Sequence, residues 1–151
     1  MEAAPVEWSG TIVDPDYFFG YCRTESDGIN VVVGTNTGVG TGKANTDALV
    51  TAMGEQAYSK VSGSVKAIYA AKACADYRGG GHSDWFLPSQ DELNQMYLNL
   101  KVKGLGGFIG TWYWSSSEFD KYRAWYQFLS NGNQFNNTRS NNPRVRPARA
   151  F

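Results

Sequence analysis

The sequence predicts an α+β domain, in which short helices pack on a twisted antiparallel sheet. Two observations predict it: apolar residues recur at helical spacing through the middle of the chain, and short aromatic or β-branched runs follow Trp114 to the C-terminus. At 151 residues and without an internal repeat, the chain is predicted to form a single domain spanning 1–151. Its 17 glycines and 15% aromatic content suit a loop-rich fold with large rings in an irregular core.

The first third of the chain is predicted to hold two or three strands. They are expected at Trp8–Val13, Tyr17–Cys22 and Ile29–Val33, because glycines separate these apolar runs. The glycine-rich stretch that follows superficially matches a phosphate-binding loop. It fails the motif, since Thr37 stands where glycine is needed and Ala44 where serine or threonine is needed. We therefore expect a loop that leads into a helix.

Three helices are expected next. The first is predicted at Asn45–Met53, and the second follows Ser64 and ends at the glycines from Gly79. The third has the clearest start signal, because Ser89 and Glu92 have the spacing of a capping box, in which each side chain satisfies a main-chain donor.

The C-terminal third is expected to be antiparallel sheet. Asn131–Gly132 separates a strand at 124–129 from another at 134–138, which is a strong hairpin signal because both turn residues tolerate positive φ. A turn at 141–143 then leads to a final strand.

Charge is distributed unevenly, although the formal net charge is zero. Residues 101–151 hold eight basic and two acidic residues, whereas residues 1–100 hold six basic and twelve acidic ones. If the final strands lie side by side, they form a basic face. The alternative is that some arginines pair with acids inside the fold. Arg146 and Arg149 are assigned mainly to structure. Six further basic residues at loop or strand-end positions are the predicted ligand-binding residues: Lys101, Lys103, Lys121, Arg123, Arg139 and Arg144.

Catalysis, metals and cofactors find little support in the sequence. Ser115–Ser117 lack a nearby base, since the only histidine is His82, and Glu118 is expected to pair with an arginine such as Arg146. Cys22 and Cys74 stand too far apart for a CxxC or zinc motif, so they form either one disulfide or two buried thiols. We expect no enzyme, no metal site and no cofactor. No apolar run is long enough for a membrane helix, and no nucleic-acid recognition motif is present.

Several ordered motifs resemble one bacterial family. They are the runs at 40–46, 84–94, 106–108, 113–118, 124–125 and 145–151. Together they resemble the C-terminal domain of the Legionella collagen-like adhesin and related bacterial C-type-lectin-like domains. The resemblance implies a C-type-lectin-like fold carried on a trimeric collagen-like stalk, whose Gly-X-Y repeat is absent from this sequence.

The resemblance also implies a function. It predicts an extracellular surface adhesin domain, homotrimeric, that binds sulfated glycosaminoglycans or other anionic polysaccharides and supports attachment and biofilm formation. The six basic residues suit this ligand, because arginine forks pair with sulfate oxyanions. Tyr113, Tyr122 and Tyr126 are expected either to stack on sugar rings or to pack. The triplets that bind calcium in sugar-binding C-type lectins do not occur.

Two rival functions remain open. Variable proteins of diversity-generating retroelements share the implied fold, and the asparagine-dense stretch Asn131–Asn142 resembles their mutable segment. Such a protein would bind a protein receptor. The other alternative is a structural trimer cap for a collagen-like stalk, which would have no affinity for glycans.

Overall fold

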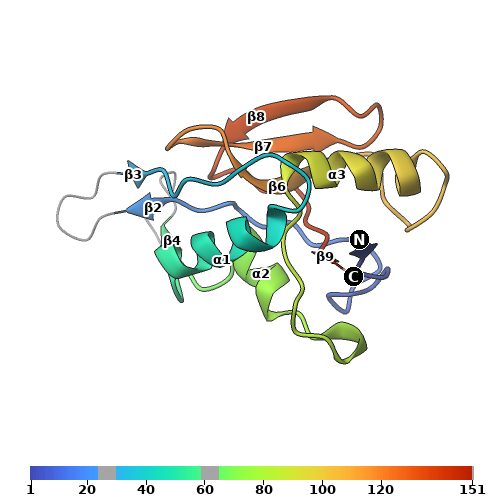
Figure 1. Cartoon of the computed structure of the whole chain (residues 1–151), viewed down its shortest axis with the longest axis horizontal. Helices are drawn as coiled ribbons and strands as arrows, with labels where there is room; N and C mark the ends of the chain where they lie inside the picture. The colour runs from blue at the N-terminus through green and yellow to red at the C-terminus, as the bar shows by residue number, and fades with distance from the viewer. Residues whose placement is uncertain (24–29, 59–64, 151) are drawn as a thin grey trace.

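The computed structural model describes residues 1–23, 30–58 and 65–150, and it combines a small antiparallel sheet with short helices (Figure 1). The helices are α1 Gly42–Met53, α2 Ala70–Asp76 and α3 Gln90–Met96, with a 3-10 turn η1 at Gly79–Gly81 and a π-helical turn η2 at Tyr97–Lys101 that continues α3. The strands are β1 Glu2–Ala3, β2 Cys22–Arg23, β3 Asn30–Val31, β4 Ala57–Tyr58, β5 Val65–Lys66, β6 Trp112–Glu118, β7 Arg123–Phe128, β8 Gln134–Thr138 and β9 Ala148–Arg149. The α+β class predicted from sequence agrees with this architecture.

The main sheet has the order β6-β7-β8 and is antiparallel throughout. The predicted hairpin is confirmed, since β7 and β8 flank the turn that contains Asn131 and Gly132. Gly132 has φ 82°, a value that glycine adopts without the steric cost a Cβ would bring. This hairpin presents aromatic and asparagine side chains at one end of the sheet.

The two ends of the described chain meet. Strands β1 and β9 pair in antiparallel register, and Phe86 pairs with Ala148 on the other side of β9. Figure 1 accordingly shows the N- and C-terminal segments side by side near α3. This pairing closes the domain.

The first helix begins three residues earlier than predicted, at Gly42, and ends at Met53 as predicted. The second prediction is wrong in its first half, because Val65 and Lys66 pair with β4 as a strand and α2 begins only at Ala70. The apolar spacing after Ser64 therefore reflected a short hairpin followed by a helix.

The third helix follows its sequence signal. Ser89 Oγ accepts the main-chain N–H of Glu92, and a Glu92 carboxylate oxygen accepts the N–H of Ser89, which confirms the capping box. Glu92 also accepts the N–H groups of Gly40 and Gly42. The same side chain thus holds the start of α1 against the start of α3.

The strand predicted at Trp8–Val13 is wrong. Trp8 N–H donates to Pro5 and Gly10 N–H to Glu7, so this segment is a series of turns. In the Tyr17–Cys22 prediction only Cys22 begins a strand, β2. The strand predicted at 29–33 is confirmed at Asn30–Val31, and residue 29 lies outside the described residues.

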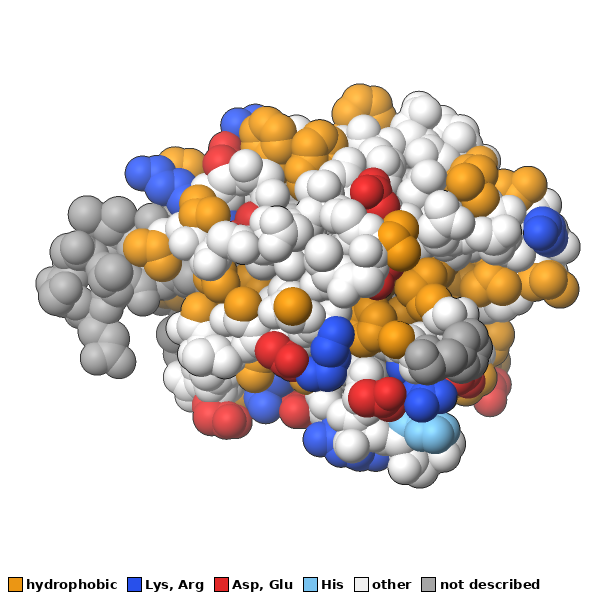
Figure 2. All heavy atoms as spheres, in the orientation of Figure 1, with side chains coloured by type: hydrophobic (Ala, Val, Ile, Leu, Met, Phe, Trp, Pro, Cys, Tyr) orange, Lys and Arg blue, Asp and Glu red, His pale blue; other side chains and the backbone are white. Residues whose placement is uncertain are grey.

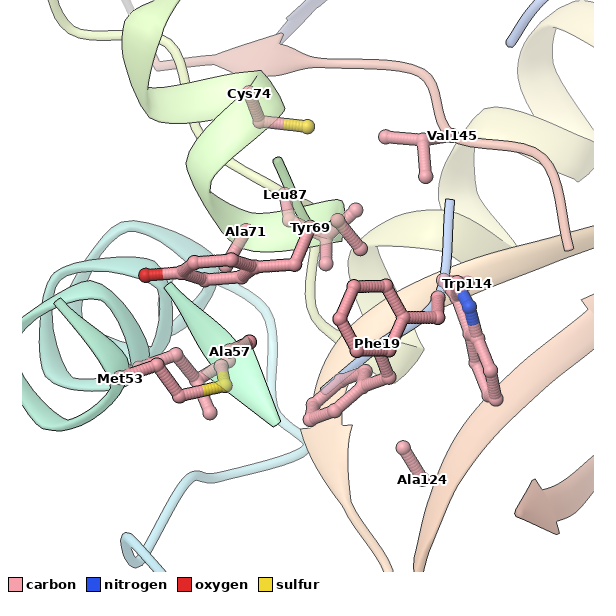
Figure 3. Close-up of a cluster of buried hydrophobic side chains, with 13 residues drawn as sticks. Phe19, Met53, Ala57, Tyr69, Ala71, Cys74, Leu87, Trp114, Ala124 and Val145 are labelled. Carbon is pink, nitrogen blue, oxygen red and sulfur yellow. The ribbon is translucent and has the colours of Figure 1, made fainter. Parts of the chain in front are cut away.

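The main core lies between the sheet and helices α1 and α2 (Figure 3). Trp114 is completely buried, and its ring meets that of Phe19 edge-on at a centroid distance of 5.6 Å. Cys74 is a free, fully buried thiol in this core, whereas the side chain of Cys22 lies outside the described part of the structure. No disulfide to Cys74 is therefore formed here. A second cluster beneath α3 contains Phe86, Leu93, Met96, Phe108, Tyr113, Leu129 and Ala148.

Candidate functional site

Four aromatic rings gather at one end of the main sheet. Trp112 stacks on Tyr126 with 4.1 Å between ring centroids and 20° between ring planes. Phe128 and Phe135 lie 4.8 and 6.0 Å from the same indole ring. The strand register places them there, because Trp112 pairs with Phe128 and Tyr126 with Phe135. These four residues form what we call the ring platform, and Phe135 remains 53% exposed on it.

A groove of about 310 Å³ opens beside the ring platform. Its lining combines two platform rings with amides, one carboxylate and one guanidinium: Asp16, Thr111, Trp112, Tyr126, Asn137, Asn141, Asn142, Pro143 and Arg144. Asn137 Nδ2 donates to the Tyr126 hydroxyl over 3.2 Å, so the amide is held against the ring. Volumes of this order suit a small ligand or one unit of a polymer.

The turn at residues 141–143 builds the far wall of the groove. Asn141 N–H donates to Thr138, and the carbonyl of Pro143 accepts the N–H of Tyr17. Arg144 then lies beside β6, where its N–H donates to Trp112. Segments from both ends of the sequence therefore meet at Trp112.

Arg144 provides the positive charge in this groove. Its Nη1 donates to the main-chain oxygen of Asp14, which anchors the guanidinium. That is the single side-chain hydrogen bond that Arg144 makes within the described ranges. Because a guanidinium carries five N–H donors in a fixed fork, most of them remain for an oxyanion ligand.

The groove brings together groups that can bind polar, ring-shaped molecules. Aromatic faces pack against flat apolar surfaces, and amide side chains both donate and accept hydrogen bonds. Sequence reasoning included Arg144 and considered Tyr126, but it missed Trp112, Asp16 and the individual asparagines. The asparagine density next to an aromatic strand was the available signal.

The structure does not bring the six predicted basic residues together. Lys101 ends η2 and Lys103 lies in the loop that leads to β6, whereas Lys121 and Arg123 lie at the turn between β6 and β7. The loop after α3 and the β6–β7 turn lie at opposite ends of the sheet (Figure 1). A seven-residue strand spans about 20 Å at roughly 3.3 Å per residue. Figure 2 likewise shows Lys and Arg side chains in separate places on this face. A continuous basic strip, as expected from sequence, is not formed within one chain.

Several of the six charges already have internal partners. Lys101 Nζ donates to the carbonyl of Phe108 over 2.9 Å, and Arg123 forms an exposed ion pair with Asp120 at 2.8 Å. Lys103 is exposed, and Lys121 lies 5.2 Å from the centroid of the Tyr122 ring.

The placement of Arg139 on a binding surface is wrong, because its side chain is completely buried. Its Nη2 pairs with Glu118 at 2.7 Å and also donates to the carbonyl of Asp120. Burial by itself raises the pKa of a carboxyl, but the N–H of Val33 and the Arg139 guanidinium outweigh it and hold the pKa of Glu118 below its ordinary value. The expected pairing of Glu118 with Arg146 is therefore corrected to Arg139.

Arg146 has a different buried partner. Its guanidinium pairs with Asp14 at 2.6 Å, and Asp14 also accepts hydrogen bonds from Trp8 Nε1 and the Tyr113 hydroxyl. Burial and the Asp14 carboxylate raise the pKa of Tyr113 well above its ordinary value. Arg149 pairs with Glu2 and Asp84 at 3.1 Å each. The structural assignment of both arginines is confirmed, and Tyr113 is packed rather than available for stacking.

The serine run serves the fold. Ser115, Ser116 and Ser117 are completely buried, Ser115 Oγ donates to Trp125, and Ser117 Oγ donates to Asn36. Ser116 Oγ accepts an amide hydrogen from Asn45. Across residues 1–23, 30–58 and 65–150 we find no cluster of three or more His, Cys, Asp or Glu side chains suited to a metal ion, and no helix long and apolar enough to cross a membrane.

Comparison with known proteins finds no match, either to a protein-family model or to a curated protein.

Proposed function

We propose that this chain is a glycan-binding adhesin domain that takes an anionic sugar unit in the groove between the ring platform and Arg144. The observation that carries the proposal is the juxtaposition of a stacked Trp112–Tyr126 pair, three asparagine amides and an anchored guanidinium around one groove. A pyranose ring packs against an indole face, its hydroxyls bond to the amides, and a sulfate or carboxylate pairs with Arg144.

The resemblance to bacterial adhesins extends this proposal. The chain is then a C-type-lectin-like domain at the bacterial surface, which acts outside the cell as a homotrimer in attachment and biofilm formation. The antiparallel pairing of the chain's two ends supports the fold assignment. Trimer assembly would present three grooves to one polymer, and linked sites bind far more tightly than a single site.

Groove recognition changes the expected role of the other charges. Lys121 and Arg123 lie too far along the sheet from Lys101 and Lys103 to share one sugar unit with them. In this proposal the half-buried Lys121 and the exposed Arg123 add weakly attractive charge for a long polymer, and salt screens that contribution strongly. Arg144 binds the sulfate or carboxylate of the sugar unit that lies in the groove.

Calorimetry tests the proposal with a heparin-derived hexasaccharide and an uncharged dextran hexasaccharide over a salt series. Trp112→Ala is expected to weaken heparin binding about tenfold through lost stacking, and Arg144→Gln by about tenfold or more through lost charge-assisted bonds. Lys103→Gln, an exposed charge outside the groove, is the matched control and should bind as the wild type does.

Each other outcome is informative. If Lys121→Gln/Arg123→Gln reduces binding while Trp112→Ala and Arg144→Gln do not, the groove is not the site. Equal affinity for dextran and heparin would contradict the part of the proposal that requires an anionic ligand. Absence of binding to both, by folded protein at low salt, contradicts the glycan function.

One observation favours a second candidate, a retroelement-diversified protein that binds a protein receptor. Asn137, Asn141 and Asn142 all line the same groove, and Phe135 beside it is largely exposed, as protein-binding surfaces often are. A reverse transcriptase gene next to a near-copy of the DNA encoding Asn131–Asn142 would support this alternative. A trimeric protein that binds neither ligand class would instead indicate a stalk cap.

A further inference from the structure

A second, larger groove lies between the N-terminal strand and the third helix, away from the ring platform. Its volume is about 810 Å³. One wall is β1 with its flanking residues, and the other is the α3–η2 segment: Met1, Glu2, Ala3, Ala4, Pro5, Val39, Gln95, Met96, Asn99, Leu100 and Gly106. The described lining residues are mainly apolar, and the one charged side chain among them is that of Glu2, which is already paired with Arg149.

Among the described strands, β1 pairs with β9 alone, so its outer edge has no strand partner there. Ala4 N–H donates to the carbonyl of Pro147, which makes Ala3 and Ala148 the non-hydrogen-bonded pair of this ladder. Ala148 turns its own N–H and C=O toward Phe86, on the far side of β9. By the same alternation, the N–H and C=O of Ala3 face away from β9, at the free edge of β1.

An edge strand beside a helix is a recurrent geometry for peptide capture. An extended peptide adds a strand through main-chain hydrogen bonds, while alternate side chains enter the space between strand and helix. The small side chains of Ala3 and Ala4 let another main chain approach closely. Pro5 has no N–H to offer, so the register of an added strand is centred on Ala3.

We propose that this groove binds an extended peptide segment of another protein, which pairs with β1 at Ala3 and places apolar side chains against Met96 and Leu100. The outward N–H and C=O of Ala3 beside an apolar groove favour an extended peptide, because its main chain offers an acceptor and a donor at strand spacing while its alternate side chains enter the groove. The proposal is independent of the glycan groove, which lies at Trp112 and Arg144.

The test is an NMR titration of ¹⁵N-labelled protein with a capped peptide, Lys-Thr-Val-Thr-Val-Thr-Lys, whose valines all project to one face of a strand. We expect shifts in the amide signals of Ala3, Gln95 and Leu100. The matched control peptide carries N-methyl groups on both valines and on the threonine between them and keeps the same apolar surface, so no central N–H can reach the carbonyl of Ala3 in either strand direction. Losing that main-chain donor should weaken binding about tenfold.

A protein variant supplies the reciprocal control. Ala3→Pro removes the outward N–H while leaving the Ala4–Pro147 bond in place, and it should weaken the unmodified peptide about tenfold without lowering the unfolding midpoint. Equal binding of both peptides would overturn strand addition. So would the absence of shifts at Ala3 and Leu100 at millimolar peptide.

Discussion

Arg139 and Glu118 form a buried ion pair, with 2.7 Å between Nη2 and Oε2 and side-chain exposures of 0% and 2%. The Glu118 carboxylate also accepts the main-chain N–H groups of Val33, Gly34 and Thr35. One carboxylate thereby joins the end of β6, the segment after β8 and the loop that precedes α1. This carboxylate accepts hydrogen bonds from four donors, which are the three main-chain N–H groups and Arg139 Nη2. Its loss would leave these polar groups without that partner.

Replacing Arg139 should therefore destabilise the protein strongly. Arg139→Met leaves the Glu118 charge buried and unpaired, and removal of one partner from a buried pair costs about 3–5 kcal/mol. The free energy of unfolding, measured by urea titration, is the test.

The control lies in the same part of the sheet. Arg123 pairs with Asp120 at the surface, with 46% of the Arg123 side chain exposed, so Arg123→Met should cost less than about 1 kcal/mol. Similar losses for Arg123→Met and Arg139→Met would show that burial does not set the difference.

Stability should fall in acid because of Glu118. Its pKa in the folded protein is lower than its ordinary value of 4.5, so the unfolded chain binds a proton first. The contribution is complete above pH 4.5 and is lost progressively as pH falls through the lower pKa of the folded state. Urea titrations at a series of pH values should show this decline, and Glu118→Gln should flatten it while lowering stability at neutral pH. An unchanged acid slope in Glu118→Gln would contradict the assignment.

The buried Cys74 thiol should be unreactive in the native protein. Burial, with a smaller effect of the Asp14 carboxylate, raises the pKa of Cys74 well above its ordinary value, and the reactive species is the thiolate. Iodoacetamide should modify Cys74 only after unfolding, as followed by mass spectrometry of its peptide. Rapid modification without denaturant would contradict the burial. Recovery of a Cys22–Cys74 linked peptide would restore the disulfide alternative that the sequence leaves open.

The two strongest local signals, the capping box and the hairpin turn, predicted local structure correctly, whereas the apolar runs at Trp8–Val13 and after Ser64 did not. Ser89 and Glu92 stand three residues apart, and the bonds of the capping box join those same two residues. The turn between β7 and β8 was equally accessible, because its conformation depends on Asn131 and Gly132 themselves.

Long-range pairing could not be predicted from spacing. Arg146 bonds to Asp14 across 132 positions, and nothing in the local pattern distinguishes this arginine from Arg144, which lines the groove. Arg139 follows a strand end, a position typical of exposed residues. Its side chain is nevertheless buried, in an ion pair with Glu118. Asp16 and Asn141 likewise line one groove although they lie far apart in the sequence, and only the fold brings them together.

Gly42 should resist substitution even though it opens a helix. Alanine is about 1 kcal/mol better than glycine inside a helix, so helix propensity alone predicts that Gly42→Ala stabilises. The structure predicts the opposite, because a Cβ at Gly42 would collide with the Glu92 carboxylate and lie 2.8 Å from the Phe86 ring. Overpacking of this kind costs about 1–3 kcal/mol. Gly38→Ala is the control: its Cβ would meet nothing closer than 4.0 Å, so its free energy of unfolding should change by about 0.5 kcal/mol or less. A stabilised Gly42→Ala would mean that α1 and α3 do not meet through Glu92.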